Sequence, residues 1–435
     1  MSFTGYGILG IVVLLFLLVA SMPVAFAMMG VGLTGFVMVV NKNAGFSMLS
    51  SDLIDTFSNP SLVVIPLFVL MGQVAFHSGI SKRLFRTAYI WIGSLPGGLA
   101  MASVVACALF GTICGSGPAT AATMSAVALP EMRRYKYDAA LASGTVASAG
   151  GLGMMIPPSV VFIVYGILTQ QSIGKLFLAG IFPGIFIAFL FCIDIYIRCL
   201  KNPSLGPAGE KSSLKEKILS MTGVIETLIL FLTVMIGIFW GFFTPTEGAG
   251  VGAGGTILLS LLLRQITWKG FIRAMMETLR TSCMILIIVA GAVILGRFFA
   301  ITRLPMTIAN SLISLPLPAW AICFLVMFFY MVGGCFIDAL ALILLTIPIF
   351  YPVVQQLGYD PIWFGVMIVI LTQIGVISPP VGINVYVVSG MDRSLSLSTV
   401  FRGSIPFLWI LVIVSVLFLI FPGLVLWFPN WLGTI

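Results

Sequence analysis

Long apolar runs recur from one end of the chain to the other, and short polar or basic segments separate them. About 20 apolar residues in a helix are needed to cross about 30 Å of hydrocarbon. The pattern therefore predicts membrane-spanning helices rather than a soluble core. The predicted spans are residues 6–22, 24–40, 60–77, 139–170 (broken), 176–198, 222–242, 246–263, 282–300, 362–389 (broken) and 405–428.

Composition supports the same conclusion. Of 435 residues, 60% are hydrophobic and only 8% are charged, whereas soluble chains are about a quarter charged. The whole chain is expected to form one all-α domain in a lipid bilayer, here a bacterial inner membrane. The net charge of +8 does not indicate nucleic acid, because the Lys and Arg residues gather between apolar runs.

Four basic clusters set the expected direction of the spans, since short cytoplasmic loops are rich in Lys and Arg. They are Lys82, Arg83 and Arg86; Arg133, Arg134 and Lys136; Arg198, Lys201, Lys211, Lys215 and Lys217; and Arg264, Lys269, Arg273 and Arg280. Between the first two clusters lies an apolar stretch that GSGPA interrupts at 115–119. One crossing would place one cluster outside, so we predict a hairpin over about 97–130 that enters from the cytoplasm.

The second half shows the opposite polarity. Residues 304–391 contain no Lys or Arg, and within them GGCFID at 333–338 interrupts another apolar stretch. A second hairpin, over about 319–353, is therefore expected to enter from the outer face. Irregular backbone at membrane depth is tolerated only when protein or a water-filled cavity surrounds it. Both hairpin tips are thus candidate sites.

Landmark residues recur at a nearly constant offset. Pro23 and Pro245 are 222 positions apart (245 − 23), and so are the two Pro-Pro pairs at 157–158 and 379–380. The hairpins align at 218, which places Ser116 opposite Gly334. Together with the opposite charge polarity, this pattern predicts two inverted repeats, 1–220 and 221–435, that meet near the membrane midplane.

The Pro-Pro pairs break their helices, because proline lacks an N–H and clashes with the preceding turn. A broken helix frees carbonyl groups at one half-end and N–H groups at the other. Free carbonyls suit a hard cation such as Na⁺, and N–H ends suit an anion. A pair of structural kinks is the alternative for either break alone. Two symmetric breaks opposite two glycine-rich tips favour binding.

Few side chains carry chemistry. Asp338 is the only acidic residue in 324–350, and carboxylates inside a membrane are costly and mostly functional. Capping of a helix is its alternative role. Ser116 and Ser159 supply hydroxyls beside the first tip and the first break. We find no motif of an enzyme, such as HExxH or a phosphate-binding loop, so the chain is not expected to be an enzyme.

Several motifs carry a family resemblance. The run GSGPATAATMSAVALPEMRRYKYDAALASGTVASAGGLGMMIPPS, followed by FTPTE, FIDALALILLTIPIFYP and ISPPVGINVYV, resembles the DctM-like large membrane subunit of TRAP (tripartite ATP-independent periplasmic) transporters. The resemblance implies an elevator mechanism, Na⁺ symport and delivery of substrate by a periplasmic binding protein. No four-helix segment precedes the first span, so the small membrane subunit is expected to be a separate chain.

The resemblance also implies site residues. Substrate would contact Ser116, Ser159 and Asp338. One Na⁺ would lie among Cys114, Ser116, Gly153, Ile156 and Pro158, and another among Gly333, Gly334, Gly375, Ser378 and Pro380. Several of these residues would act through backbone carbonyls.

The sequence therefore predicts the large subunit of a Na⁺-coupled importer of a small organic anion. C4-dicarboxylates, sialic acid, other carboxylates and sulfonates all remain candidates. A standalone H⁺-coupled carrier and a passive channel are the alternatives.

Overall fold

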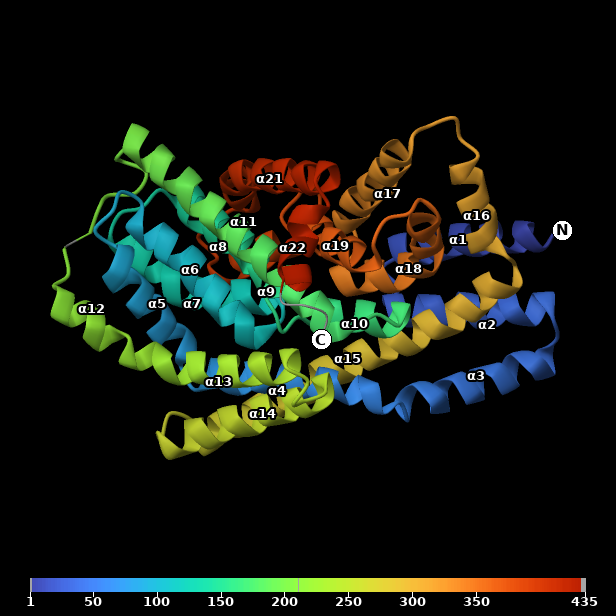
Figure 1. Ribbon diagram of the computed structural model, residues 1–435, viewed down its shortest axis with the longest axis horizontal. Coiled ribbons are helices and arrows are strands. Elements are labelled where there is room, and N and C mark those ends of the chain that lie inside the picture. Colours follow the sequence, from blue (N-terminus) through green and yellow to red (C-terminus); the bar gives the residue numbers. More distant parts are fainter. Residues whose placement is uncertain (1, 210, 432–435) are drawn as a thin grey trace.

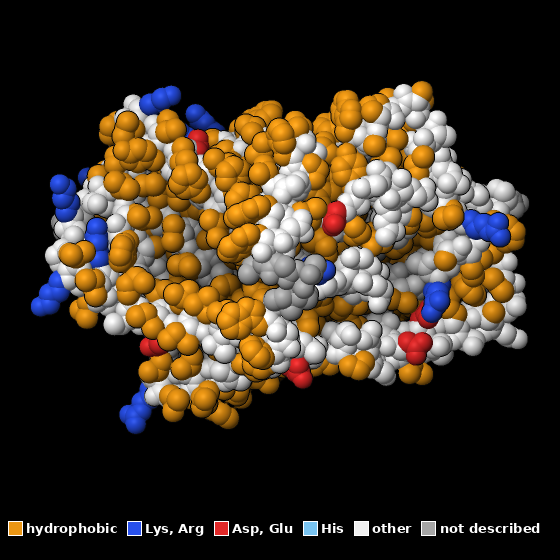
Figure 2. Space-filling view, viewed as in Figure 1, with side chains coloured by type: hydrophobic (Ala, Val, Ile, Leu, Met, Phe, Trp, Pro, Cys, Tyr) orange, Lys and Arg blue, Asp and Glu red, His pale blue; other side chains and the backbone are white. Residues whose placement is uncertain are grey.

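A computed structural model describes residues 2–209 and 211–431, and within these ranges the regular structure is helical, without a strand. Seven of the described helices are long and apolar enough to cross a membrane. Hydrophobic side chains cover much of the face in Figure 2, and most visible Lys and Arg side chains gather at the end that carries α5 (Ile80–Ile92) and α12 (Leu214–Ser220) in Figure 1. The predicted all-α integral membrane architecture is confirmed.

One set of helices, here called the frame, runs along the lower side of Figure 1. These helices pack mainly on one another, with α15 lying against α2, α3 and α4, and α14 against α4. The frame consists of α1 (Phe3–Val19), α2 (Val24–Val39), α3 (Lys42–Phe57), the 3-10 turn η1 (Pro60–Val63), α4 (Val64–His77), α13 (Thr222–Phe239), α14 (Pro245–Leu262) and α15 (Trp268–Ile301).

The second set is called the bundle and contains both hairpins and both broken helices. It consists of α6 (Gly98–Cys114), α7 (Gly117–Arg134), α8 (Ala139–Gly150), α9 (Leu152–Met155), α10 (Val160–Thr169), α11 (Ile173–Lys201), α17 (Ala319–Gly334), α18 (Ala339–Gln356), α19 (Pro361–Gly375), α20 (Ile383–Met391), α21 (Leu397–Ile420) and α22 (Gly423–Trp431). Two arms link the sets: α5 packs on α6 and α13, and α16 (Leu304–Ile313) packs on α18 and α1.

The contacts between frame and bundle are apolar. Each ion pair among the described residues lies inside the frame, inside the bundle, or between an arm and the frame. No hydrogen bond in the described part of the chain joins a frame helix directly to a bundle helix. Dispersion contacts without directional bonds permit sliding better than a network of hydrogen bonds does, because they have no fixed partners to lose.

The two predicted hairpins and two broken helices are present. Helices α6 and α7 form the first hairpin, and α17 and α18 form the second. In Figure 1 the first hairpin extends from the end that carries α5, and the second from the end that carries α16. Their tips approach each other in the middle of the molecule. The hairpins thus enter from opposite ends, as the charge pattern predicts.

Helix boundaries follow the repeat closely but correct one detail. Helices α7 and α18 are both 18 residues long, and their limits are 222 positions apart at each end. Ser116 is the residue before α7 and Asp338 the residue before α18, so Ser116 corresponds to Asp338. The predicted hairpin offset of 218 is wrong by four residues. Such a shift is nearly one helical turn and keeps side chains on the same face, so apolar pattern alone does not reveal it.

Two predicted spans also change. Helix α15 begins at Trp268 rather than near residue 282. The basic residues Arg273 and Arg280 therefore lie on this helix and not in a loop. The predicted span 405–428 is two helices, since α21 ends at Ile420 and α22 begins at Gly423. The division into repeats 1–220 and 221–435 stays a prediction.

Small residues set the closest helix contact in the bundle. Gly403 of α21 lies against Ala140 of α8, and Gly144 lies against Gly403, so that a methyl group at either glycine would overlap backbone atoms of the other helix. Without a hydrophobic driving force between helices in lipid, such close backbone approach is a main source of association. The broken helix α8 is therefore held to α21 through glycine.

We expect Gly403→Ala to reduce stability. Alanine is the better helix former, but here its methyl group overpacks the contact, at a cost of about 1–3 kcal/mol. Thermal unfolding of the detergent-purified protein should shift to lower temperature. Gly254→Ala in α14, where a methyl group meets nothing within 4 Å, is the matched control and should unfold at or above the wild-type temperature. Equal behaviour of the two variants would contradict this account.

Candidate functional site

The first hairpin tip is tied to the first helix break through its backbone. Gly115 ends α6 in the left-handed region (φ +63°), and a methyl group there would lie 2.7 Å from the Pro158 carbonyl oxygen. The Gly115 carbonyl accepts a hydrogen bond from the Val160 N–H at 3.4 Å. Ser116 then begins α7 in an extended conformation. Only glycine permits both this turn and this approach.

The first break separates α9 from α10. Ile156 is extended, Pro157–Pro158 is a cis peptide, and Ser159 is the N-cap of α10. No backbone N–H in the described chain donates to the carbonyls of Ile156 or Pro158. The carbonyl of Ser116 lies beside the break as well, since a methyl group on Gly153 would lie 2.9 Å from its oxygen. The tip and the break together enclose a set of carbonyl oxygens, here called the first cradle.

The second tip and break repeat this arrangement. Gly334 and Gly375 touch, since a methyl group on Gly375 would lie 2.5 Å from the Gly334 Cα. The Val381 N–H donates to the Cys335 carbonyl at 3.3 Å, which ties the break to the tip. The break contains a second cis peptide, Pro379–Pro380. The predicted residues at this tip and break form the second cradle.

The second cradle offers the same kinds of oxygen ligand for a cation as the first cradle. The carbonyls of Ser378 and Pro380 receive no backbone N–H from the described residues. The Ser378 hydroxyl donates to the Ile374 carbonyl at 2.7 Å. No group of three His, Cys, Asp or Glu side chains that could hold a metal ion occurs among the described residues. The oxygens on offer are backbone carbonyls and hydroxyls, which are hard donors suited to an alkali cation.

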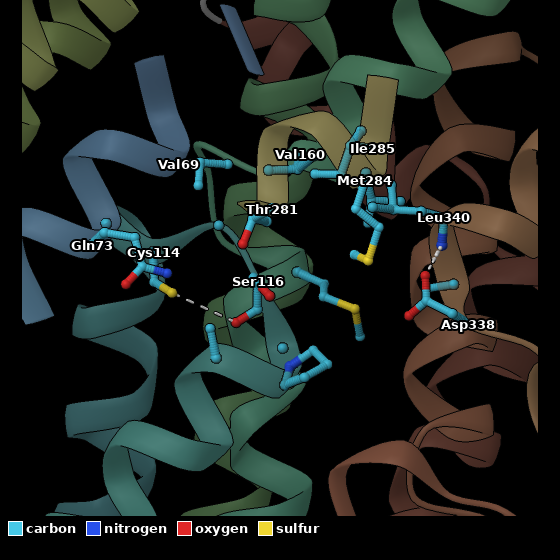
Figure 3. Close-up of a pocket in the computed structure, with 18 residues that line it drawn as sticks. Val69, Gln73, Cys114, Ser116, Val160, Thr281, Met284, Ile285, Asp338 and Leu340 are labelled. Carbon is cyan, nitrogen blue, oxygen red and sulfur yellow. Dashed lines mark hydrogen bonds between the residues drawn. The ribbon is translucent and has the colours of Figure 1, made fainter. Parts of the chain in front are cut away.

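A cavity of about 270 Å³ lies between the two tips and the frame (Figure 3). From the bundle it is lined by Cys114, Gly115, Ser116, Gly117, Pro118, Ala119, Met154, Val160, Val161, Asp338, Ala339 and Leu340, and from the frame by Val69, Gly72, Gln73, Thr281, Met284 and Ile285. Gly72 lets the frame reach the first tip, because a methyl group there would lie 3.0 Å from the Cys114 Cα.

Three helices begin at this cavity: α7, α10 and α18 each contribute residues of their first turn to its wall. The N–H groups of Gly117 and Ala119 donate to no carbonyl or side chain among the described residues. Helix N-termini carry partial positive charge and bind anions. No Lys, Arg or His lies among the described lining residues, so backbone amides are the positive groups that an anion would meet.

Of the three predicted substrate-binding residues, two reach the cavity. Ser116 and Asp338 face it from the two tips, and the Asp338 carboxylate accepts the Leu340 N–H at 3.1 Å (Figure 3). Ser159 is fully buried behind Val160, and its hydroxyl donates to the Met154 carbonyl at 2.5 Å. The capping role considered for Asp338 is present alongside its exposure to the cavity.

Sequence reasoning missed the frame side of the cavity. Gln73 lies on the predicted span 60–77 and Thr281 just before the predicted span 282–300, so neither belongs to a predicted hairpin or helix break. The one available signal is polarity, since Gln73 interrupts the apolar run of α4.

Comparison with known proteins places this architecture. Residues 11–424 match the family described as "Tripartite ATP-independent periplasmic transporter, DctM component". The chain belongs to the DctM family. Among curated relatives, the C4-dicarboxylate TRAP transporter large permease protein DctM of Pseudomonas aeruginosa is 34% identical over 88% of this chain and 90% of that protein.

Other DctM relatives are named for other anions. The sialic acid TRAP transporter large permease protein SiaM of Vibrio cholerae is 32% identical over 95% of this chain and 96% of its own. The isethionate TRAP transporter permease protein DctMQ of Oleidesulfovibrio alaskensis is 33% identical, over 87% of this chain and 59% of its own. The solved structure of the Alcanivorax borkumensis YdaH transporter has the same fold, with a TM-score of 0.60 at 15% identity over 87% of this chain and 88% of that one.

The glycine pair of the second cradle gives a prediction for this DctM chain. Gly375→Ala should push the second tip away from the break, because the methyl group has no room against Gly334. The half-buried Cys335 thiol at that tip should then react several-fold faster with a small maleimide, as quantified by peptide mass spectrometry. The exposed Cys283 is the internal reference, and Gly390→Ala, in open space, is the control. An unchanged Cys335 rate would show that the tip tolerates the methyl group.

Proposed function

We propose that the chain is the large membrane subunit of a Na⁺-coupled secondary transporter in a bacterial inner membrane. It imports a small organic anion that a periplasmic binding protein delivers. One observation supports this most: a single cavity faced by three helix N-termini lies between two tips, each joined to a break with free carbonyls. The cavity binds the anion, and the two cradles bind the cations.

The anion is held without a basic side chain. Its carboxylate or sulfonate lies at the start of α7, where the Gly117 and Ala119 amides have no other acceptor. The Ser116 hydroxyl, which makes no hydrogen bond within the described chain, donates to it. Asp338 accepts a hydrogen bond from a second polar group, such as a hydroxyl or amine, on the same molecule. Each of these protein groups thus binds a different part of the substrate.

Cations in the cradles reduce the cost of crossing. An unpaired anion in a low-dielectric interior is expensive, and a nearby cation offsets that cost. The carbonyls of Ile156 and Pro158 in the first cradle, and of Ser378 and Pro380 in the second, coordinate Na⁺ in place of water. Each cation that accompanies the anion also couples transport to the membrane potential, at about 2.3 kcal/mol per charge per 100 mV.

The bundle carries the cavity past the frame in an elevator movement. Support comes from the interface between them, which has no hydrogen bond or ion pair among the described residues. The cavity lies at this interface, so displacement of the bundle exposes it to one side of the membrane and then to the other. The arms α5 and α16, which contact both sets, absorb the movement.

Two partner proteins complete the transporter: a small membrane subunit on a separate chain and the periplasmic binding protein. The tripartite family description supports this assembly. The named relatives handle C4-dicarboxylate, sialic acid and isethionate, which share a negative charge and small size. A substrate of this chemical class fits the amide-lined cavity.

The deciding experiment is uptake into proteoliposomes that hold the chain with its small subunit, with binding protein and labelled succinate, N-acetylneuraminate, isethionate or 2,3-diketogulonate outside. We expect one acid to accumulate saturably, and only with both an inward Na⁺ gradient and the binding protein. Uptake driven by a pH gradient without binding protein would favour the standalone H⁺ carrier. Non-saturable uptake indifferent to Na⁺ would favour the channel.

A second prediction tests Asp338. Asp338→Asn preserves helix capping, since asparagine is as good an N-cap as aspartate, but removes the charged acceptor. Because a hydrogen bond to a charged group contributes about 1.5–3 kcal/mol, we expect KM for uptake to rise at least about tenfold. Asp360→Asn is the matched control: Asp360 also caps a bundle helix, α19, but lies outside the cavity. Similar kinetics for the two variants would exclude Asp338 from the substrate site.

A further inference from the structure

The frame contributes polar side chains to the cavity, although nothing in the hairpin motifs marks them. Of its six lining residues, four are apolar or glycine, and two are polar: Gln73 of α4 and Thr281 of α15. In Figure 3 the Thr281 hydroxyl is directed toward Ser116, and Gln73 lies on the side of Cys114. The frame is therefore not an inert wall at this point.

Thr281 differs from most threonines on the helices of this protein. Thr278, one turn earlier on α15, donates its hydroxyl to the Ala274 carbonyl at 2.7 Å. Thr120 and Thr346 donate in the same way to carbonyls four residues earlier. The Thr281 hydroxyl makes no hydrogen bond with any described residue. Since back-bonding is the usual state of a helical threonine in apolar surroundings, a hydroxyl left free beside a cavity indicates a partner from outside the chain.

The Gln73 side chain also lacks a hydrogen-bond partner among the described residues, and it carries more polar atoms than threonine. Its side-chain amide offers two N–H donors and a carbonyl oxygen, and none of them has a partner in the described chain. The residue is half-buried in an otherwise apolar helix. Its amide atoms are not among the buried side-chain atoms without a partner in the described chain, so they open into the cavity and are available to a ligand there.

We propose that Gln73 and Thr281 bind the transported anion from the frame side, in the state that this structure represents. The ligand class is a small organic anion with a polar group beyond its carboxylate or sulfonate. The inference rests on the proposed function, and it adds residues outside the hairpins and breaks to the substrate site. Ser116 and Asp338 hold the anion from the bundle, while Gln73 and Thr281 hold it from the opposite wall.

This location has a consequence that bundle residues do not share. The frame does not travel with the bundle, so the anion meets Gln73 and Thr281 in one position of the bundle and leaves them behind in the other. Their contribution to affinity is therefore one-sided across the membrane. Neither residue is among those of the two cradles, so neither contacts Na⁺ in the proposed arrangement.

The test uses the full complex in proteoliposomes and whichever of the four labelled acids the wild type accumulates. For Thr281→Val and Gln73→Leu we measure KM for uptake from outside and the half-saturating internal concentration of the same unlabelled acid in exchange. We expect one of the two constants to rise about fivefold, as for loss of one hydrogen bond, and the other to stay unchanged. At saturating acid, the Na⁺ concentration for half-maximal uptake should also stay unchanged, because neither residue contacts Na⁺.

Thr278→Val is the matched control, because it removes a hydroxyl from the same helix that is already satisfied by its own backbone. It should leave both constants unchanged. The proposal is overturned if Thr281→Val and Gln73→Leu match this control, or if they shift the constants equally on both sides. If the wild type accumulates none of the acids, the proposed function fails first, and this inference falls with it. A wild type that transports while the variants behave normally overturns the inference alone.

Discussion

The structure depends on one constraint: backbone that leaves regular helix within a membrane must be enclosed by other parts of the chain. In the described residues, two hairpin tips and two helix breaks are such places, and each tip lies against a break. The close approach of Gly334 and Gly375, and of Gly115 and Pro158, makes this possible. A side chain at any of these glycines would separate tip from break and open irregular backbone to lipid.

Because the tips and breaks are enclosed, their unpaired backbone N–H and carbonyl groups lie in distinct places. Helices α7, α10 and α18 begin at the cavity. The Gly117 and Ala119 N–H groups of α7 have no acceptor in the described chain, whereas carbonyls without a backbone donor lie at the breaks. Positive and negative ends of peptide dipoles are thereby separated into distinct places without a single basic side chain in the described wall. The wall therefore presents backbone N–H groups rather than basic side chains to the cavity.

Several ion pairs hold each set of helices together. Arg297 of α15 donates to both oxygens of the buried Asp52 of α3, and Arg133 of α7 pairs with Asp392 beyond α20. The first pair braces the frame and the second braces the bundle. The ion pairs of the described residues lie within the two sets or between an arm and the frame, and none crosses the boundary between frame and bundle where the cavity lies.

The membrane class, the two hairpins, the two breaks and most helix positions can be predicted from the amino-acid pattern alone. Length of apolar runs, Pro-Pro pairs and the distribution of Lys and Arg report directly on hydrocarbon thickness, helix interruption and sidedness. The repeat is also predicted from the sequence, but with a hairpin register displaced by four residues. Prolines occur at both Pro348 and Pro352, so the apolar pattern fits either the offset of 218 or that of 222.

How these elements meet depends on the packing of the folded chain. Asp52 and Arg297 are 245 positions apart and carry no local signal of pairing. Ser159 and Ser116 look alike in sequence, yet one hydroxyl is consumed by the Met154 carbonyl and the other is free at the cavity. Gln73 and Thr281 reach the same cavity from separate frame helices. Contacts of this kind depend on how helices pack across hundreds of residues, and a local pattern records only which face of a helix is apolar.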